Sequence, residues 1–152
     1  MTETYKDLIG LIERLHRRCL DVIKVEIDRH EIRNLNPVQA MILFNIGDRE
    51  FMMGQLIEYG YYLGSNISYN IKKMVEHGYV VQTRSAYDRR SLNARSSERG
   101  REVCAHIEDL FGCHAAQLAE HMRMDEELVH TRAALLKLED LWSTGRHSLP
   151  QR

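Results

Sequence analysis

Residues 64–101 decide the fold, and they read GSNISYNIKKMVEHG (64–78), YVVQTRS (79–85), AYDRRS (86–91) and LNARSSERGR (92–101). Ile67, Ile71 and Met74 recur at helical spacing, which predicts a helix with one apolar face. Ser65 suits its N-cap and Gly78 its C-terminal stop. The alternating residues that follow favour a strand, and the charged segment 86–91 favours a turn. The stretch therefore predicts a helix, a strand, a charged turn and a returning strand.

The polar face of this helix, next to a basic hairpin, favours binding to double-stranded DNA. A helix fits the major groove, whereas a hairpin reaches the minor groove or the phosphates. Asn and Ser side chains can bond base edges, and Lys can also neutralise phosphates. The alternative is a solvated polar face, and Tyr69 could instead pack beneath the hairpin. The side chains expected to face the groove are Ser65, Asn66, Ser68, Tyr69, Asn70, Lys72 and Lys73.

The charge distribution supports this interpretation, although the net charge of −1 alone does not. Residues 65–101 hold 8 Lys or Arg and 3 Asp or Glu. Residues 1–64 hold 8 and 10, and residues 102–152 hold 5 and 9. Positive charge is thus concentrated in the helix and hairpin, with acidic flanks that limit non-specific binding. A charge run alone is usually a solvated face.

Length and composition indicate one globular domain in a reducing compartment. The 152 residues suffice for one core, and a hydrophobic content of 43% argues against disorder. The sequence has no run of 18 apolar residues and no signal-peptide pattern, so we expect a cytoplasmic protein without a membrane span. Cys19, Cys104 and Cys113 lie far apart or in segments of apolar periodicity, which argues against a disulfide framework.

Long helices are expected on both sides of this stretch. Residues 4–33 carry two apolar stripes, which suggests packing on the protein's own body and on a second copy; a central core helix is the alternative. Asn36 and Pro37 are expected to start a second helix that ends at Gly47. Residues 48–51 could add a strand to the hairpin edge, and residues 52–59 a short helix.

After the hairpin, Ser97 is the expected N-cap of a long helix that continues to about residue 122. Asp125 is expected to cap a final helix that ends at Gly145. The predicted fold is mainly α with a small β-wing: a winged helix-turn-helix core flanked by long N- and C-terminal dimerisation helices. It forms a single domain, 1–152, with a DNA-binding lobe at 35–96 and dimerisation helices at 1–34 plus 97–145.

The sequence resembles the MarR family of bacterial transcription regulators. The matching segments are residues 35–39 (LNPVQ), 74–80 (MVEHGYV), 88–91 (DRRS) and 97–101 (SERGR). The resemblance implies a homodimer that binds a pseudo-palindromic operator, represses or sometimes activates transcription, and responds to a ligand or oxidant. The chain departs from the family at Ser96-Ser97, where a Leu-Thr pair is usual, and in its amide-rich segment 66–70.

The resemblance also implies roles in the wing. Asp88 would pair with a wing arginine to shape the turn, and Arg90 would reach the minor groove, where narrow A·T tracts attract guanidinium groups. The alternative for Asp88 is a simple turn former. Phosphate contacts are expected from Arg84 and Arg95 on the strands, and from the helix start at Asn36. Arg89, Arg90 and Asp88 complete the predicted DNA-binding set.

The signal that the protein senses is less well indicated. By analogy with the family, an effector would lie between the dimerisation helices and the DNA-binding lobe, near His16, Met41, Phe44 and Tyr62. Cys19 could sense oxidants, although its apolar stripe favours an inert core thiol. The histidines of the segment after the wing lack compact metal-ligand spacing, so no metal and no cofactor is expected.

Two other functional classes fit the sequence less well than DNA binding. An enzyme is not expected, because the sequence has no Gly-x-Ser-x-Gly, P-loop, His-Glu-x-x-His or Gly-x-Gly-x-x-Gly motif. A winged helix that binds only protein would favour exposed apolar or aromatic anchors over Asn, Ser and Lys. The sequence therefore predicts a DNA-binding regulator. The family resemblance implies that it represses from an operator as a homodimer and is released by a small molecule or oxidant.

Overall fold

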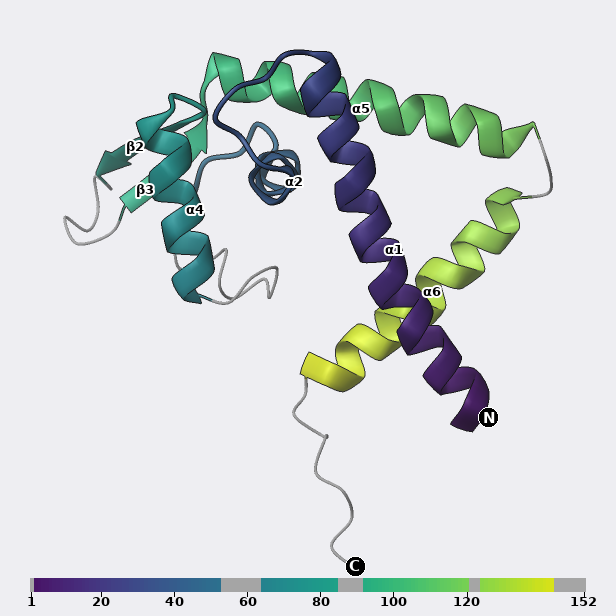
Figure 1. Cartoon of the computed structure of the whole chain (residues 1–152). Helices are drawn as coiled ribbons and strands as arrows, with labels where there is room; N and C mark the ends of the chain where they lie inside the picture. The colour runs from purple at the N-terminus through teal and green to yellow at the C-terminus, as the bar shows by residue number, and fades with distance from the viewer. Residues whose placement is uncertain (1, 53–63, 85–91, 121–123, 144–152) are drawn as a thin grey trace, which may run out of the picture. The chain divides into compact units, whose positions relative to one another are not determined.

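The computed structural model describes residues 2–52, 64–84, 92–120 and 124–143. Most of these residues are helical, and three short strands form one small antiparallel sheet (Figure 1). The expected fold class, mainly α with a small β-wing, is confirmed. The chain divides into two compact units, Met1–Leu110 and Phe111–Arg152. The predicted short helix at 52–59 falls mainly outside the described residues, and Met52 belongs to a strand.

The first helix, α1 (Thr2–Arg29), ends before residue 33, where the sequence pattern had placed its end. The chain leaves the helix through Glu31 and Asn34, whose φ angles of 52° and 59° are left-handed. A right-handed helix cannot contain such residues, so the apolar Ile32 belongs to the turn. His30 stacks on His106, with 3.6 Å between the ring centroids, and its Nε2 lies 2.9 Å from a carboxylate oxygen of Glu26.

The second helix, α2 (Pro37–Ile46), begins and ends where the sequence predicts. Asn36 is its N-cap: the side chain of Asn36 accepts from the backbone N–H of Gln39, and the backbone N–H of Asn36 donates to the side chain of Gln39. This reciprocal pair satisfies two amide groups that the first turn leaves free. Gly47 ends the helix with a φ of 60°. In Figure 1, α2 is seen end-on between α1 and α4.

The helix α4 (Gly64–Glu76) begins one residue before the predicted N-cap, Ser65, and ends before Gly78, whose φ is 76°. It packs on α2 and on the strand that follows it. Burying each large apolar side chain stabilises the fold by about 1.5–3 kcal/mol. The largest fully buried side chains of this core are Tyr79, Ile23, Ile42, Leu43, Ile67, Ile71, Met74 and Ile107.

The sheet has the order β1–β3–β2, so its central strand is the last in sequence. β1 (Phe51–Met52) pairs with β3 (Leu92–Ser96) at the end of the segment where an edge strand was expected. β2 (Val80–Arg84) pairs with β3 along its full length, from Val80 opposite Ser96 to Arg84 opposite Leu92. This register forms the base of the predicted hairpin.

Ser96 and Ser97 join the sheet to α5 (Glu98–Ala119). Ser97 caps the helix as predicted, because its Oγ accepts from the N–H of Gly100 at 3.0 Å and donates to the carbonyl of Gly78 at 2.7 Å. Ser96 is only 2% exposed, and its hydroxyl donates to the carbonyl of Gly47 at 3.0 Å. A buried hydrogen bond thus occupies the position where the resemblance to the MarR family implies an apolar anchor.

The second unit contains the end of α5 and the helix α6 (Met124–Ser143). This helix begins one residue before Asp125, the predicted cap, so Asp125 lies inside its first turn. Within this single subunit, large apolar side chains of α6 are exposed to solvent, including Leu128, Val129, Leu135 and Leu136. Such a surface is typical of a helix that packs against a partner.

Candidate nucleic-acid interface

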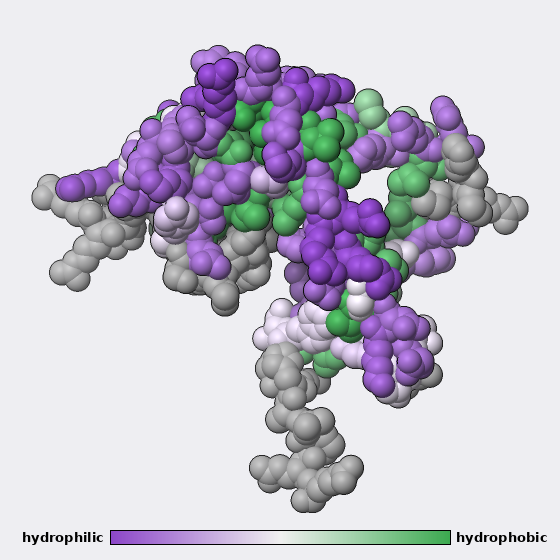
Figure 2. Space-filling model, in the orientation of Figure 1, coloured by the Kyte–Doolittle hydropathy of each residue, from purple (hydrophilic) through white to green (hydrophobic). Residues whose placement is uncertain are grey.

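The helix α4 separates its side chains into a buried and an exposed set. Ile67, Ile71 and Met74 face the core and are fully buried. Tyr69 is 61% exposed, which excludes the alternative that it packs beneath the hairpin. The other exposed side chains described on this helix are Asn66, Ser68, Lys72 and Glu76. Figure 2 shows a mainly hydrophilic surface over α4 and the adjoining strands. The described part of the predicted polar face is therefore present on one helix.

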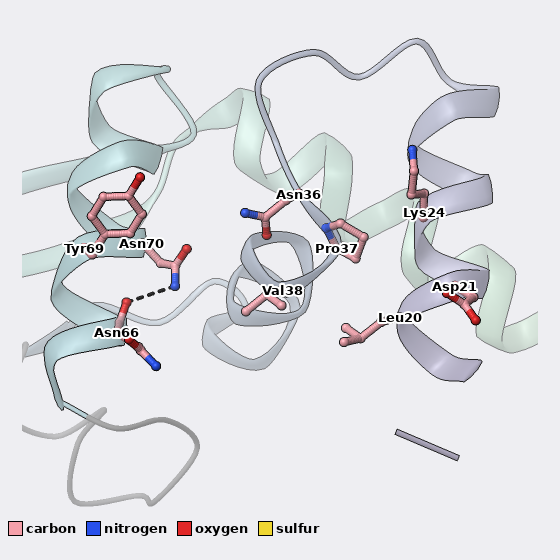
Figure 3. Close-up of a pocket in the computed structure, with 9 residues that line it drawn as sticks. All are labelled: Leu20, Asp21, Lys24, Asn36, Pro37, Val38, Asn66, Tyr69 and Asn70. Carbon is pink, nitrogen blue, oxygen red and sulfur yellow. Dashed lines mark hydrogen bonds between the residues drawn. The ribbon is translucent and has the colours of Figure 1, made fainter. Parts of the chain in front are cut away.

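Asn70 belongs to the predicted set, but its amide is hydrogen-bonded within the lobe. Its Oδ1 accepts from Nε2 of Gln39 at 3.2 Å, and its Nδ2 donates to the carbonyl of Asn66 at 2.9 Å. The second of these bonds is drawn in Figure 3. The side chain of Asn70 is half-buried, unlike that of Asn66. Both ends of the Asn70 amide thus have a protein partner.

The two adjacent lysines differ in their surroundings. The Nζ of Lys73 lies 2.7 Å from a carboxylate oxygen of Glu76, one helical turn on. This hydrogen bond lowers the pKa of Glu76 and raises the pKa of Lys73. Lys72 is exposed and forms no ion pair with another described residue. Lys72 consequently carries the more available positive charge.

The two strand arginines lie on opposite faces of the sheet. Arg95 is paired with Val81, and Arg84 is paired with Leu92. Because successive side chains of a strand point to opposite faces, Arg95 and Arg84 lie on different faces of the sheet. Arg84 shares its face with the buried Val80 and Ala94, but lies at the exposed end of β2. Arg95 therefore projects from the outer face of the hairpin, whereas Arg84 does not. Asp88, Arg89 and Arg90 lie outside the described residues, as does the side chain of Ser65.

A hollow of about 470 Å³ lies between α1, the start of α2 and α4. Figure 3 shows that Asn66, Tyr69 and Asn70 come from α4, and that Leu20, Asp21 and Lys24 come from α1. Its walls combine amides, a phenol and one acidic and one basic group over apolar side chains. The described residues that line it are Leu20, Asp21, Lys24, Asn36, Pro37, Val38, Asn66, Tyr69 and Asn70.

None of the described residues predicted for an effector lines this hollow. His16 is exposed on α1, Met41 and Phe44 are half-buried on α2, and Tyr62 lies outside the described residues. Leu20 and Lys24 were not predicted from the sequence, because their place beside α4 depends on tertiary packing. Gln39 was not predicted either, although the pattern of Asn36 followed three residues later by Gln is a capping-box signature.

The three cysteines are free, and two of them are partly buried. Burial raises the pKa of the Cys19 thiol above its usual value. Burial, with a smaller contribution from Asp48, raises the pKa of Cys104 to about 11. A raised pKa disfavours the reactive thiolate, which supports the interpretation of Cys19 as an inert thiol. In the described segments, no three His, Cys, Asp or Glu side chains are grouped to hold a metal ion.

A capped helix, a second helix with a polar face and a β-hairpin in this order define a winged helix-turn-helix, which is a DNA-binding fold. The family model that matches residues 33–91 is that of the MarR family. Over 142 residues the chain is 32% identical to the exopolysaccharide II synthesis transcriptional activator ExpG of Rhizobium meliloti (strain 1021), covering 93% of this chain and 73% of that protein.

Solved structures share the fold at low sequence identity. A MarR transcriptional regulator from Methanosarcina mazei Go1 has a TM-score of 0.73 and 19% identity, with 88% of this chain and 96% of that one covered. FabT of Streptococcus pneumoniae, solved in complex with DNA, has a TM-score of 0.69 and 14% identity, with 92% and 99% covered.

The chain belongs to the MarR family, and it is a transcription regulator with a DNA-binding winged-helix fold. This family and fold are those of regulators rather than enzymes. Among the described helices, none combines the length and apolar character that crossing a bilayer requires.

Proposed function

We propose that the protein binds a pseudo-palindromic operator as a homodimer through the exposed face of α4 and through the wing. The observation that carries the proposal is the polar face of α4 beside the base of a basic hairpin. Asn and Ser supply groups for base edges, whereas Lys72 and Arg95 supply charge for phosphates. The proposed contacts are Asn36, Ser65, Asn66, Ser68, Tyr69, Lys72, Lys73, Arg84, Asp88, Arg89, Arg90 and Arg95.

Dimerisation is supported by the apolar side chains that a single subunit leaves exposed on α1 and α6. Leu11, Leu15 and Val25 of α1 are between 43% and 67% exposed. Two copies related by a two-fold axis would bury such surfaces and present two α4 helices to one face of the duplex. An inverted repeat with half-sites about one helical turn apart matches that symmetry.

The sign of regulation follows from where the operator lies. Repression, as the family resemblance implies, requires an operator that overlaps a promoter. The relative ExpG is named a transcriptional activator, and an activator binds upstream of its promoter. A small molecule or oxidant that releases the protein from DNA completes the proposal.

Selection of genomic fragments by the purified protein, followed by footprinting, tests the proposal. We expect an inverted repeat with protection on one face of the duplex, at a stoichiometry of two subunits per site. Binding that is equally strong to every duplex, or absent at low salt, would contradict it. Metabolites and oxidants can then be screened for release of the selected fragment, and a reporter fused to it gives the sign of regulation.

A further inference from the structure

A continuous chain of hydrogen bonds connects the start of α2 to the DNA-facing helix α4. The backbone N–H of Asn36 donates to Oε1 of Gln39 at 3.1 Å, and Nε2 of Gln39 donates to Oδ1 of Asn70 at 3.2 Å. Nδ2 of Asn70 then donates to the carbonyl of Asn66 at 2.9 Å. Gln39 is only 5% exposed, although it is polar. A buried amide between two helices needs such partners, because an unsatisfied one is costly.

The donor-to-acceptor direction of this series of hydrogen bonds is fixed at both of its ends by backbone groups. The N–H of Asn36 can only donate, so the oxygen of Gln39 must face it and its NH₂ must face Asn70. The carbonyl of Asn66 can only accept, so the NH₂ of Asn70 must face it and its oxygen must face Gln39. The two side-chain amides therefore have one orientation in which every bond in the chain is formed.

We propose that Gln39 is a positioning residue for DNA recognition and that Asn70 is its relay to α4 rather than a base-contacting residue. Apolar packing holds α4 on the core but is not directional. The amide chain is directional and sets the rotation of the helix about its own axis. Side-chain tips lie about 5–6 Å from a helix axis, so a turn of about 10° displaces them by about 1 Å. Such a shift misaligns hydrogen bonds to base edges.

The inference rests on the proposed DNA-facing surface of α4, and one substitution separates it from a simple capping role. In Gln39→Glu, one carboxylate oxygen still accepts from the N–H of Asn36, and an acidic group in the first turn suits the helix dipole. The other oxygen faces Oδ1 of Asn70, so two acceptors meet. If Asn70 turns its amide over, its oxygen meets the carbonyl of Asn66 instead. The cap on α2 survives, whereas the relay breaks.

The experiment compares wild type, Gln39→Glu, Asn70→Ala and the double variant on the selected operator and on a random duplex of equal length. We expect each single variant to weaken operator binding on the order of tenfold, the scale of losing one good base contact. Affinity for the random duplex should stay near that of wild type. The urea unfolding midpoint should fall modestly in each single variant, because each leaves a buried polar group without its hydrogen-bond partner. In the double variant, Gln39→Glu should add no further loss. A pure charge effect of Glu would instead persist there and lower binding to both duplexes.

Repeating the operator selection with Asn70→Ala distinguishes a relay from a base contact. A relay should relax the preference at several base pairs of each half-site, whereas a base contact relaxes it at one. Additive losses, a single relaxed base pair, or a Gln39→Glu protein that binds like wild type would overturn the inference. If the wild-type protein selects no operator at all, the proposed function fails, and this outcome is distinct from failure of the relay.

Discussion

At Gly100, an added Cβ would overlap the carbonyl oxygen of Tyr79 and lie 3.4 Å from a methyl carbon of Leu43. The carbonyl of Tyr79 is itself held by the N–H of Ser97 at 2.9 Å, so it has little freedom to move away. The guanidinium of Arg99 covers the ring of Tyr79 at 4.3 Å from its centroid. The Ser-Glu-Arg-Gly motif thus fixes the start of α5 against the end of α4.

We predict that Gly100→Ala lowers the free energy of unfolding by about 1–3 kcal/mol or more, the usual cost of overpacking. Gly112→Ala in the same helix is the matched control, since its added Cβ would meet no atom within 4 Å. That control should gain about 0.5–1 kcal/mol, because alanine favours a helix interior over glycine. Urea unfolding at equal protein concentration measures both changes, and a Gly100→Ala protein as stable as wild type would refute the packing argument.

The cysteines give a second prediction at this scale. With a pKa of about 11, Cys104 is ionised in roughly one molecule in a thousand at pH 8, so it should alkylate slowly. The rate should rise about tenfold per pH unit towards pH 11, because the thiolate fraction rises in that proportion. Iodoacetamide labelling followed by peptide mass spectrometry should find the exposed Cys113 modified first and Cys19 later. Cys19 reacting as fast as Cys113 would restore it as a candidate oxidant sensor.

At the scale of elements, the neighbouring lysines of α4 should contribute unequally to DNA binding. Each phosphate contact contributes about −0.9 to the slope of log affinity against log salt. Lys72→Ala should therefore make the slope shallower by about 0.9. Lys73→Ala should change it less, because Glu76 already partners that ammonium group. Salt titrations of operator binding measure both slopes, and identical slopes for wild type and Lys72→Ala would exclude a phosphate contact there.

The starts of the helices could be predicted from the sequence wherever capping residues determine them. Asn36-Pro37 and Ser97 start their helices as expected, because capping acts within one turn. The end of α1 was misplaced, since Ile32 continues the apolar pattern although the turn beside it is left-handed at Glu31. The periodicity of apolar residues predicts the buried face of a helix, but it gives no information on the backbone φ angle of any residue.

The candidate interface was only partly predictable for a different reason. The exposed side of α4 follows from its apolar stripe, so Asn66 and Lys72 could be placed from the sequence. The bond between Gln39 and Asn70 joins residues 31 positions apart, and no local pattern indicates it. The sequence therefore identified Asn70 as polar and groove-facing, but not that its amide is bonded within the protein. Lys24 is beside the DNA-facing helix for the same tertiary reason.

At the scale of the whole molecule, the proposed dimer depends on apolar side chains of α6. Leu135→Lys should place a charge in the buried interface, shift the protein to monomers in sedimentation analysis and weaken operator binding sharply. Ala133→Lys is the matched control, because it adds the same charge at another exposed position of the helix. A Leu135→Lys protein that remains dimeric would remove this face of α6 from the interface.

The order of the sheet has a consequence for how the nascent chain matures. β3 is synthesised last and pairs with both β1 and β2, so neither outer strand has a neighbour until residues 92–96 have left the ribosome. The carbonyl of Tyr79 also gains its partner only with Ser97. Translation that stalls before this point would leave two unpaired strand edges, which are prone to aggregate. The three-stranded sheet of the lobe is therefore expected to form late in synthesis and in one step.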